Sequence, residues 1–292
     1  MDSKMHAEVK DKNGNTMTTP AASVTSAIKS AASLSSKIVA NKFFRALAVA
    51  GLCAFGNNAS ADTIFGLHGS VHLWQPELSG TIGQNTNAFD FSSSFSGDRG
   101  DSTSLLAAVE HPIPLIPNFQ LRTTPVSWTG SSDMATGTLL GTITLSGEVD
   151  AEFDLTALDG TAYYEVLDNW ISIDLGVTAR RIDGFIEVVS PAAGLSDRVN
   201  IDQVLPMAYA HVRFDLPFTG LSIGARGNAI AFSGNNLTDI EAYVQLEFDV
   251  IPLLDIGIQG GYRRLGLEIE DIDDFESDAA LGGAYIALTG HF

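Results

Sequence analysis

Acidic residues recur at one kind of position in this chain, at the end of an alternating segment and just before a short turn. The four members of this set are Glu110, Glu165, Asp215 and Asp249. Each is soon followed by Pro or Asn, residues typical of tight turns. A set of carboxylates at one end of a channel attracts cations. The spacing therefore predicts an acidic ring at the mouth of a barrel, which could set a preference for cations.

Basic residues fall on the same side of neighbouring segments. The five candidate partners of the acids are Arg122, Arg180, Arg213, Arg226 and Arg263. Buried charges are tolerated when they are paired, so a second interpretation is an ion-paired network that fills a narrow interior. Gly176, Gly224 and Gly257 also face inward and favour an open path, because they would leave space between strands.

Histidines raise the question of a metal or catalytic site. His68 and His72 face the same way, but they lie about 13 Å apart along one strand, too far to share an ion. We expect lumen histidines hydrogen-bonded to acids, with no cofactor and no metal. His211 lies near the middle of a segment, and no Asp–His or Ser–His pair follows from its spacing. We therefore predict that the protein is not an enzyme, with a lipid- or peptide-modifying enzyme as an alternative.

Side-chain alternation with a period of two predicts the elements that position these residues. The expected strands span residues 63–74, 102–111, 119–128, a strand that ends at 165, then 171–189, 205–215, 221–232, 241–249, 254–269 and 278–292. Longer connections are expected at 75–101, 130–137, 190–201 and 268–277, with a β extension over 139–149. The fold class is all-β, an antiparallel up-and-down barrel of ten strands, or of eight if residues 128–161 form a loop.

Alternation alone does not tell which face is inside, because a soluble lipocalin-like barrel would place its apolar face inward. Three observations favour a transmembrane barrel. An export signal precedes it, and Phe292 ends an alternating strand in phase with Leu288. Tyr164, Phe214 and Phe248 recur on the apolar face beside turns, as an aromatic girdle requires. Both termini and the Pro-containing turns are then periplasmic, and the longer connections face outward.

The amino-terminal region reads as targeting sequence. Residues 42–61 combine a basic start, a short apolar run and a small-residue cleavage site between Ala61 and Asp62. This pattern predicts a secretory signal peptide that is too short to span a bilayer. Residues 1–41 are polar and are interpreted as a disordered leader or as the result of a start site placed too early. Cys53, the one cysteine, lies within the segment expected to be removed.

Charge excludes one class of partner. The formal net charge is -19, and every Lys lies at or before Lys42, so the barrel segment is strongly acidic. Nucleic acid requires a basic face, and we therefore expect no nucleic-acid partner. Two arginine doublets, Arg180-Arg181 and Arg263-Arg264, must each place one side chain outward. An outward arginine could contact lipopolysaccharide phosphates or neutralise nearby carboxylates.

Three segments carry a resemblance to a known family. They are Glu110–Asn118 (EHPIPLIPN), Tyr163–Asn169 (YYEVLDN) and Leu216–Gly220 (LPFTG). The chain resembles an outer-membrane β-barrel family of marine gammaproteobacteria, as in Shewanella- and Vibrio-like species, over nearly all of Asp62–Phe292. The leader of 41 residues departs from the family's usual short signal. The resemblance implies a fold and a location but no activity.

Together these features predict an integral protein of the bacterial outer membrane, exported with cleavage of its signal peptide. Its role is expected to be structural or passive, with at most a narrow cation-preferring pore, and a porin-like small-solute channel is the alternative. The expected partners are outer-membrane lipid, lipopolysaccharide and the barrel-assembly machinery, which would recognise the last strand ending at Phe292. A monomer is expected.

Overall fold

The computed structural model describes residues 9–10, 16–17, 65–84, 87–90, 96–97, 100–140, 143–191, 194–232, 234–251, 254–272 and 275–292. Within the leader, β1 (Val9–Lys10) and β2 (Thr16–Met17) form a short antiparallel pair. The predicted signal peptide and its cleavage site lie outside the described residues. In the described part of the chain, no helix is long and apolar enough to cross a membrane.

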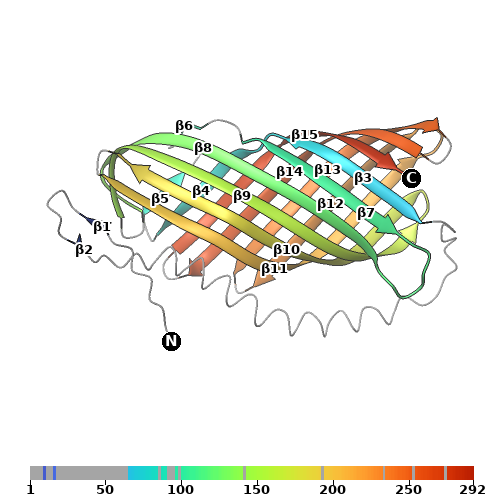
Figure 1. The fold of residues 1–292 in the computed structure, drawn as a ribbon, viewed down its shortest axis with the longest axis horizontal. Helices are drawn as coiled ribbons and strands as arrows, with labels where there is room; N and C mark the ends of the chain where they lie inside the picture. Colours follow the sequence, from blue (N-terminus) through green and yellow to red (C-terminus); the bar gives the residue numbers. More distant parts are fainter. Residues whose placement is uncertain are drawn as a thin grey trace.

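Long antiparallel strands form a closed ten-stranded barrel, which confirms the predicted fold class and excludes the eight-stranded alternative. The strands are β3 (Gly66–Trp74) with its continuation β4 (Glu77–Gln84), β7 (Ser102–Glu110), β8 (Asn118–Leu140), β9 (Ile143–Asp168), β10 (Ile171–Ser190), β11 (Leu195–Leu216), β12 (Leu221–Phe232), β13 (Asn235–Ile251), β14 (Leu254–Ile272) and β15 (Phe275–His291). Each pairs with the next, and β15 returns to β3 (Figure 1). Closure leaves no strand edge unpaired in lipid.

A bend after Trp74 divides the first strand into β3 and β4, which both pair with β15. The Trp74 indole donates a 3.1 Å hydrogen bond to the carbonyl of Gly283. Position 283 suits glycine because a Cβ there would collide with the backbone of Gln75. The prediction of one long loop over 75–101 was therefore wrong. The segment contains β4, β5 (Asn87–Asp90), which pairs with β4, and β6 (Ser96–Gly97), which pairs with β8.

The predicted faces of the barrel are confirmed along β13. Val244, Leu246 and Phe248 are exposed on the outer surface, whereas Tyr243 and Gln245 are buried inside. The same apolar exterior recurs on the other strands, as a barrel surrounded by hydrocarbon requires. The apolar face is therefore the outer face, opposite to that of a lipocalin-like barrel.

This polarity inverts at the end of the barrel opposite Phe292. Along β9 the outward series changes from exposed Leu158 to exposed Asp154, Glu152 and Asp150, while Phe153 is buried inside. The buried apolar side chains of the interior cluster include Trp74, Val126, Trp128, Phe153, Leu281 and Tyr285. An apolar core inside acidic walls is the arrangement of a protein surrounded by water. The barrel therefore continues beyond its lipid-facing band as a water-facing extension.

This extension corrects three expected loops. Residues 130–137 belong to β8, most of 190–201 to β11, and most of 268–277 to β14 and β15. The predicted β extension over 139–149 is present, in the β8–β9 hairpin. Water surrounds these strand ends, so their outward residues are polar. Their composition therefore resembles that of a loop.

Candidate functional site: the ion-paired barrel interior

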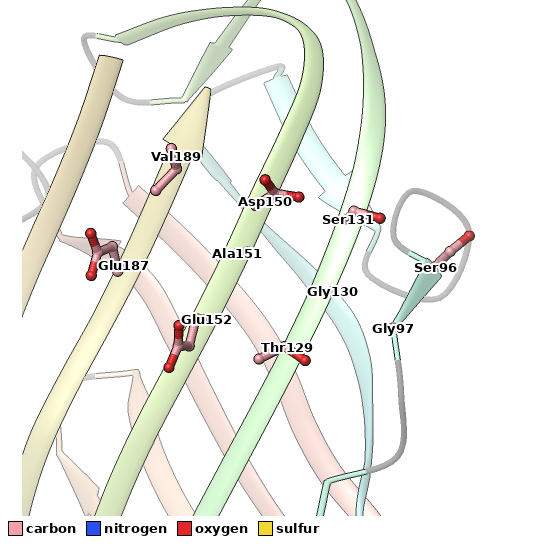
Figure 2. Close-up of a pocket in the computed structure, with 10 residues that line it drawn as sticks. All are labelled: Ser96, Gly97, Thr129, Gly130, Ser131, Asp150, Ala151, Glu152, Glu187 and Val189. Atoms are coloured by element: carbon pink, nitrogen blue, oxygen red, sulfur yellow. The ribbon is translucent and has the colours of Figure 1, made fainter. Parts of the chain in front are cut away.

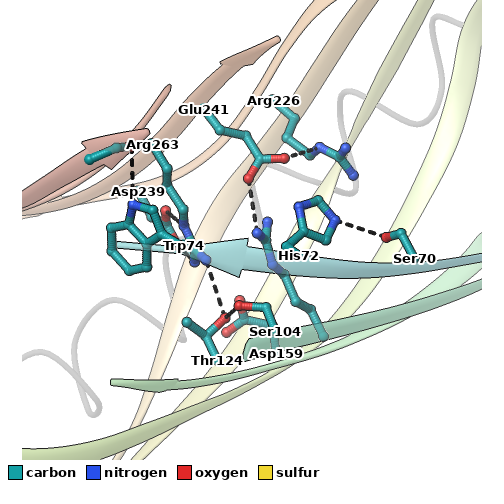
Figure 3. Close-up of polar contacts among 12 residues, drawn as sticks. Ser70, His72, Trp74, Ser104, Thr124, Asp159, Arg226, Asp239, Glu241 and Arg263 are labelled. Carbon is teal, nitrogen blue, oxygen red and sulfur yellow. Dashed lines mark hydrogen bonds and ion pairs between the residues drawn. The ribbon is translucent and has the colours of Figure 1, made fainter. Parts of the chain in front are cut away.

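Asp239 is the centre of the charged interior (Figure 3). Its carboxylate accepts hydrogen bonds from Arg180 at 2.6 Å and from Arg263 at 2.7 and 2.8 Å. Arg180 also binds Asp159 through two hydrogen bonds, of 2.7 and 2.6 Å. Both arginines are at most 1% exposed. Paired geometry of this kind is what permits charges to be buried.

A second pair of arginines meets at Glu241. Arg122 Nη2 on β8 lies 2.9 Å from Glu241 Oε2 on β13, and Arg226 Nε on β12 lies 2.5 Å from Oε1. β8 and β13 are separated by the same number of strands in both directions around the barrel. The Arg122–Glu241 ion pair therefore connects opposite walls across the lumen.

Hydroxyl and aromatic groups complete this layer. Arg263 donates a 3.3 Å hydrogen bond to Thr124, and its guanidinium lies 4.9 Å from the ring centre of Trp74. His72 is fully buried nearby, but its Nε2 is 2.8 Å from the Ser70 hydroxyl (Figure 3). The expectation that His72 would bond to an acid was therefore wrong, whereas the same expectation for His68 is confirmed by its 2.9 Å contact with Glu110.

The inward glycines do not leave open space. A Cβ at Gly176 would lie 2.7 Å from Cβ of Tyr163, and one at Gly224 would lie 2.6 Å from the Tyr243 ring. The Tyr243 ring thus covers Gly224, and the backbone of the neighbouring strand at Ala162 and Tyr163 lies against Gly176. Gly257 is likewise covered by Thr289. The three glycines allow close packing inside the barrel and do not support an open path.

The four predicted ring acids all lie at the short-turn end of the barrel. Glu110 contacts His68 and accepts a 2.8 Å hydrogen bond from Tyr163, and Glu165 accepts one of 3.2 Å from Asn118. The ring of His68 stacks on that of His291 with centroids 4.0 Å apart. These two acids therefore belong to a hydrogen-bonded cluster on one side of the mouth.

The other side of the mouth is ion-paired. Arg213 donates hydrogen bonds to Asp215 at 2.7 Å and to Glu247 at 2.9 Å. Asp249 lies opposite Asp255 in the β13–β14 register, and its side chain is outside the described residues. Among the ring acids whose side chains are described, Asp215 pairs with one of the five predicted basic partners, Arg213. The other four arginines bind acids deeper in the barrel.

Sequence reasoning missed Asp159 and Asp239. Both lie in phase with other inward-facing acids, Asp239 with Glu241 and Asp159 with Glu165. Extending the eighth expected strand by one alternation would have included Asp239.

A histidine-centred chain of hydrogen bonds was also missed. Asp174 Oδ2 is 2.8 Å from Nδ1 of His211, and Nε2 of His211 is 2.7 Å from the Tyr243 hydroxyl. These residues come from three strands, so no local spacing could indicate the chain. Among the described residues, no group of three or more His, Cys, Asp or Glu side chains could hold a metal ion.

The arginine doublets divide between the two faces as predicted. Arg180 and Arg263 point inward, whereas Arg181 and Arg264 are exposed. Arg181 donates a 2.9 Å hydrogen bond to Asp202 on the outer wall. Neutralisation of a neighbouring carboxylate thus accounts for Arg181.

A recess lies on the outer wall of the extension (Figure 2). Its acidic lining comes from Asp150 and Glu152 on β9 and from Glu187 on β10, and its edge is formed by Ser96 and Gly97 of β6. Glu187 is held by a 3.0 Å ion pair with Arg198. The recess is part of the water-facing acidic wall.

No protein-family model and no curated protein matches this chain. Solved structures include barrels with a similar arrangement at low identity. The outer-membrane protease OmpT of Escherichia coli is 7% identical with a TM-score of 0.45, covering 82% of this chain and 100% of that chain. The translocator domain of the autotransporter NalP of Neisseria meningitidis is 11% identical with a TM-score of 0.39, covering 87% and 95%. These likenesses carry no argument about function, and the predicted family resemblance stays a prediction.

The class of protein follows from the barrel itself. Strands close without an edge, the outer band is apolar, and the buried arginines of the interior are ion-paired with acids. This is the architecture of an outer-membrane β-barrel protein of the Gram-negative type.

Proposed function

We propose that this protein is a structural or passive outer-membrane barrel whose lumen is closed by its own ion pairs. At most, it passes small cations through a narrow path. The observation that carries the proposal is the Arg122–Glu241 ion pair, which joins opposite walls at 2.9 Å. A channel for solutes would need this cross-section to be open.

Packing around the ion pair supports the same proposal. Met207, Gln259 and Thr178 point inward and are at most 1% exposed. Side chains that water cannot reach from inside the barrel leave no hydrated path at their level. A barrel of ten strands is only a little wider than one that side chains fill completely.

Conductance in a planar bilayer tests this proposal. The protein purified from membranes, with folding checked by its heat-dependent migration, is expected to give no discrete current steps. Large, stable steps of uniform size would contradict a closed lumen. Small cation-selective steps would match the narrow-path form of the proposal.

A variant can open the proposed closure. Arg122→Ala removes the side chain that crosses the lumen but leaves Glu241 paired with Arg226. We expect current steps to appear in this variant. The matched control is Arg181→Ala, which removes an arginine from an exposed ion pair on the outer wall and should stay silent.

A small-solute channel is the second candidate, and the mouth acids are the observation that favours it. Their neutralisation by Glu110→Gln, Glu165→Gln, Asp215→Asn and Asp249→Asn should shift the reversal potential of any conducting form towards that of an unselective pore. An unchanged reversal potential would show that the acidic ring does not set the ion selectivity.

The proposal does not include catalysis. Both ring nitrogens of His211 lie within 2.8 Å of protein partners, Asp174 and Tyr243, and these partners are buried in the packed interior, so we assign the three residues a role in packing. A general base must reach the proton that it removes. An activity against lipid or peptide that His211→Ala abolishes would overturn this part of the proposal.

A further inference from the structure

Two bulky residues adopt an uncommon backbone conformation at the short-turn end of the barrel. Leu115, in the β7–β8 turn, has φ of 70°, and Phe218, in the β11–β12 turn, has φ of 66°. Among the described residues, no other residue except glycine has a positive φ. The left-handed region is unfavourable for a side chain of this size. A strained conformation persists where the surrounding structure or a function requires it.

Packing within the barrel does not account for these residues. The side chain of Leu115 is 69% exposed, and that of Phe218 is 107% exposed. Both turns therefore hold an apolar side chain away from the protein. This is the reverse of what a turn in water favours, because glycine or asparagine adopts the same conformation without the strain.

Contacts on the outside of the barrel join the β7–β8 turn to β9 and the β9–β10 turn to the end of β11. The hydroxyl of Tyr164, an outward-facing residue, donates a 2.9 Å hydrogen bond to the carbonyl of Leu115. Trp170, in the β9–β10 turn, packs against Phe214 with ring centroids 5.3 Å apart, and its carbonyl accepts a 3.0 Å hydrogen bond from the Asp215 amide. The Tyr164 contact holds the first turn against the lipid-facing wall and not over the lumen.

The exposed side chains of these turns form a set that we call the turn collar. Its members are Ile113, Leu115, Ile116, Val166, Trp170 and Phe218. The three turns contain no Lys or Arg. An apolar surface of this kind marks contact with a membrane or a protein. The collar is continuous with the girdle residues Tyr164 and Phe214, which favours the membrane.

We propose that the turn collar inserts into the periplasmic leaflet of the outer membrane, with Leu115 and Phe218 as its anchors. Its partner is a phospholipid surface. Short turns face the periplasm in barrels of this type, and apolar side chains at the boundary between headgroups and acyl chains gain by burial. The strained backbone positions direct the two anchors into that boundary.

Spin labels on single cysteines test the depth of the anchors. Cys53→Ala in the full chain removes the native thiol, and Leu115→Cys or Phe218→Cys then carries a nitroxide in phosphatidylcholine vesicles. We expect each label to collide several-fold more often with oxygen than with a water-soluble nickel chelate. The control Ser96→Cys, on the water-facing extension, should show the reverse. Turn labels as accessible to nickel as the control would overturn the proposal and leave a soluble periplasmic partner.

Trp170 provides a second test without altering either strained turn. Trp74 and Trp128 are 2% and 7% exposed and are shielded from quenchers, whereas Trp170 is 57% exposed. Lipids brominated near the headgroup should quench the share of emission that Trp170→Phe removes. Quenching of that share by aqueous iodide, with none from brominated lipid, would overturn the insertion of the collar.

Discussion

Asp239 on β13 accepts a 2.6 Å hydrogen bond from Arg180 on β10, so their ion pair bridges two intervening strands of the barrel wall. The same carboxylate binds Arg263 from the neighbouring strand β14. One acid thus compensates two guanidinium groups that water does not reach. The stability of the interior therefore depends on this acid more than on any single exposed charge.

Removal of Asp239 should destabilise the barrel strongly. Asp239→Ala leaves Arg263 without its acid and Arg180 with Asp159 alone. Loss of one partner from a buried ion pair costs about 3–5 kcal/mol, because the remaining charge is uncompensated. Urea-induced unfolding of the protein in lipid vesicles would measure this loss as a lower midpoint.

The control for this experiment is an exposed ion pair. Asp202→Ala removes the nearer of the two acidic partners of Arg181 on the outer wall and leaves Asp183; the Arg181 and Asp202 side chains are both more than half exposed. Exposed pairs contribute little because water and salt screen them. The unfolding midpoint should not move. Equal losses in the two variants would show that burial does not decide the strength of the central ion pair.

The sequence was sufficient to predict the barrel and the faces of its strands. Alternation over the expected strand 241–249, for example, puts Tyr243 and Val244 on opposite faces, and Tyr243 lies inward and Val244 outward. The same rule separated Arg180 from Arg181 and Arg263 from Arg264. A period of two fixes which face each residue occupies, and the apolar exterior follows from the surrounding lipid.

The pairing inside the barrel could not be predicted in the same way. Arg122 and Glu241 are 119 positions apart in the chain and meet because β8 and β13 lie on opposite walls. Which charges meet depends on strand number and stagger. The strands were also predicted too short. Beyond the lipid band their outward residues are polar, and residues such as Glu152 therefore resemble those of a loop.

The Tyr243 ring over Gly224 leads to a second prediction. Gly224→Val would force a side chain into the Tyr243 ring and the Val212 carbonyl, which lie 2.6 and 2.9 Å from the position of its Cβ. Overpacking of this kind costs about 1–3 kcal/mol. Urea unfolding should detect the loss. Gly260→Val is the matched control, because nothing lies within 4 Å of a Cβ at this outward position. A loss of equal size in both would contradict a filled interior at Gly224.

The change of the outward residues from apolar to acidic predicts where the bilayer ends. Val244 lies within the outer apolar band, and Asp154 lies outward on the extension. Val244→Arg should lower the free energy of unfolding in vesicles by about 2–4 kcal/mol, the cost of an arginine near the middle of the bilayer. Asp154→Arg should leave it unchanged, since this side chain is in water. A similar cost at both sites would mean that lipid also surrounds the extension.

The core of the extension should unfold separately from the ion-paired layer below it. The ring of Trp128 stacks on that of Phe153 with centroids 5.7 Å apart, and it lies so close to Gly97 and Gly130 that a Cβ at either would collide with it. Trp128→Ala removes the largest side chain at this point of the core. Truncation of a buried Trp costs about 3–5 kcal/mol.

Hydrogen exchange of backbone amides would show which part of the barrel Trp128→Ala destabilises. Amides of β8 and β9 around Trp128 and Phe153 should exchange faster in Trp128→Ala. Amides beside Arg122 and Arg263 should keep their protection, because the free energy of local opening depends on the contacts of the region that opens. The strands at the level of the ion pairs remain held by those pairs and by the surrounding lipid. Uniformly faster exchange along β8 would instead show that the apolar core and the ion-paired layer unfold as one unit.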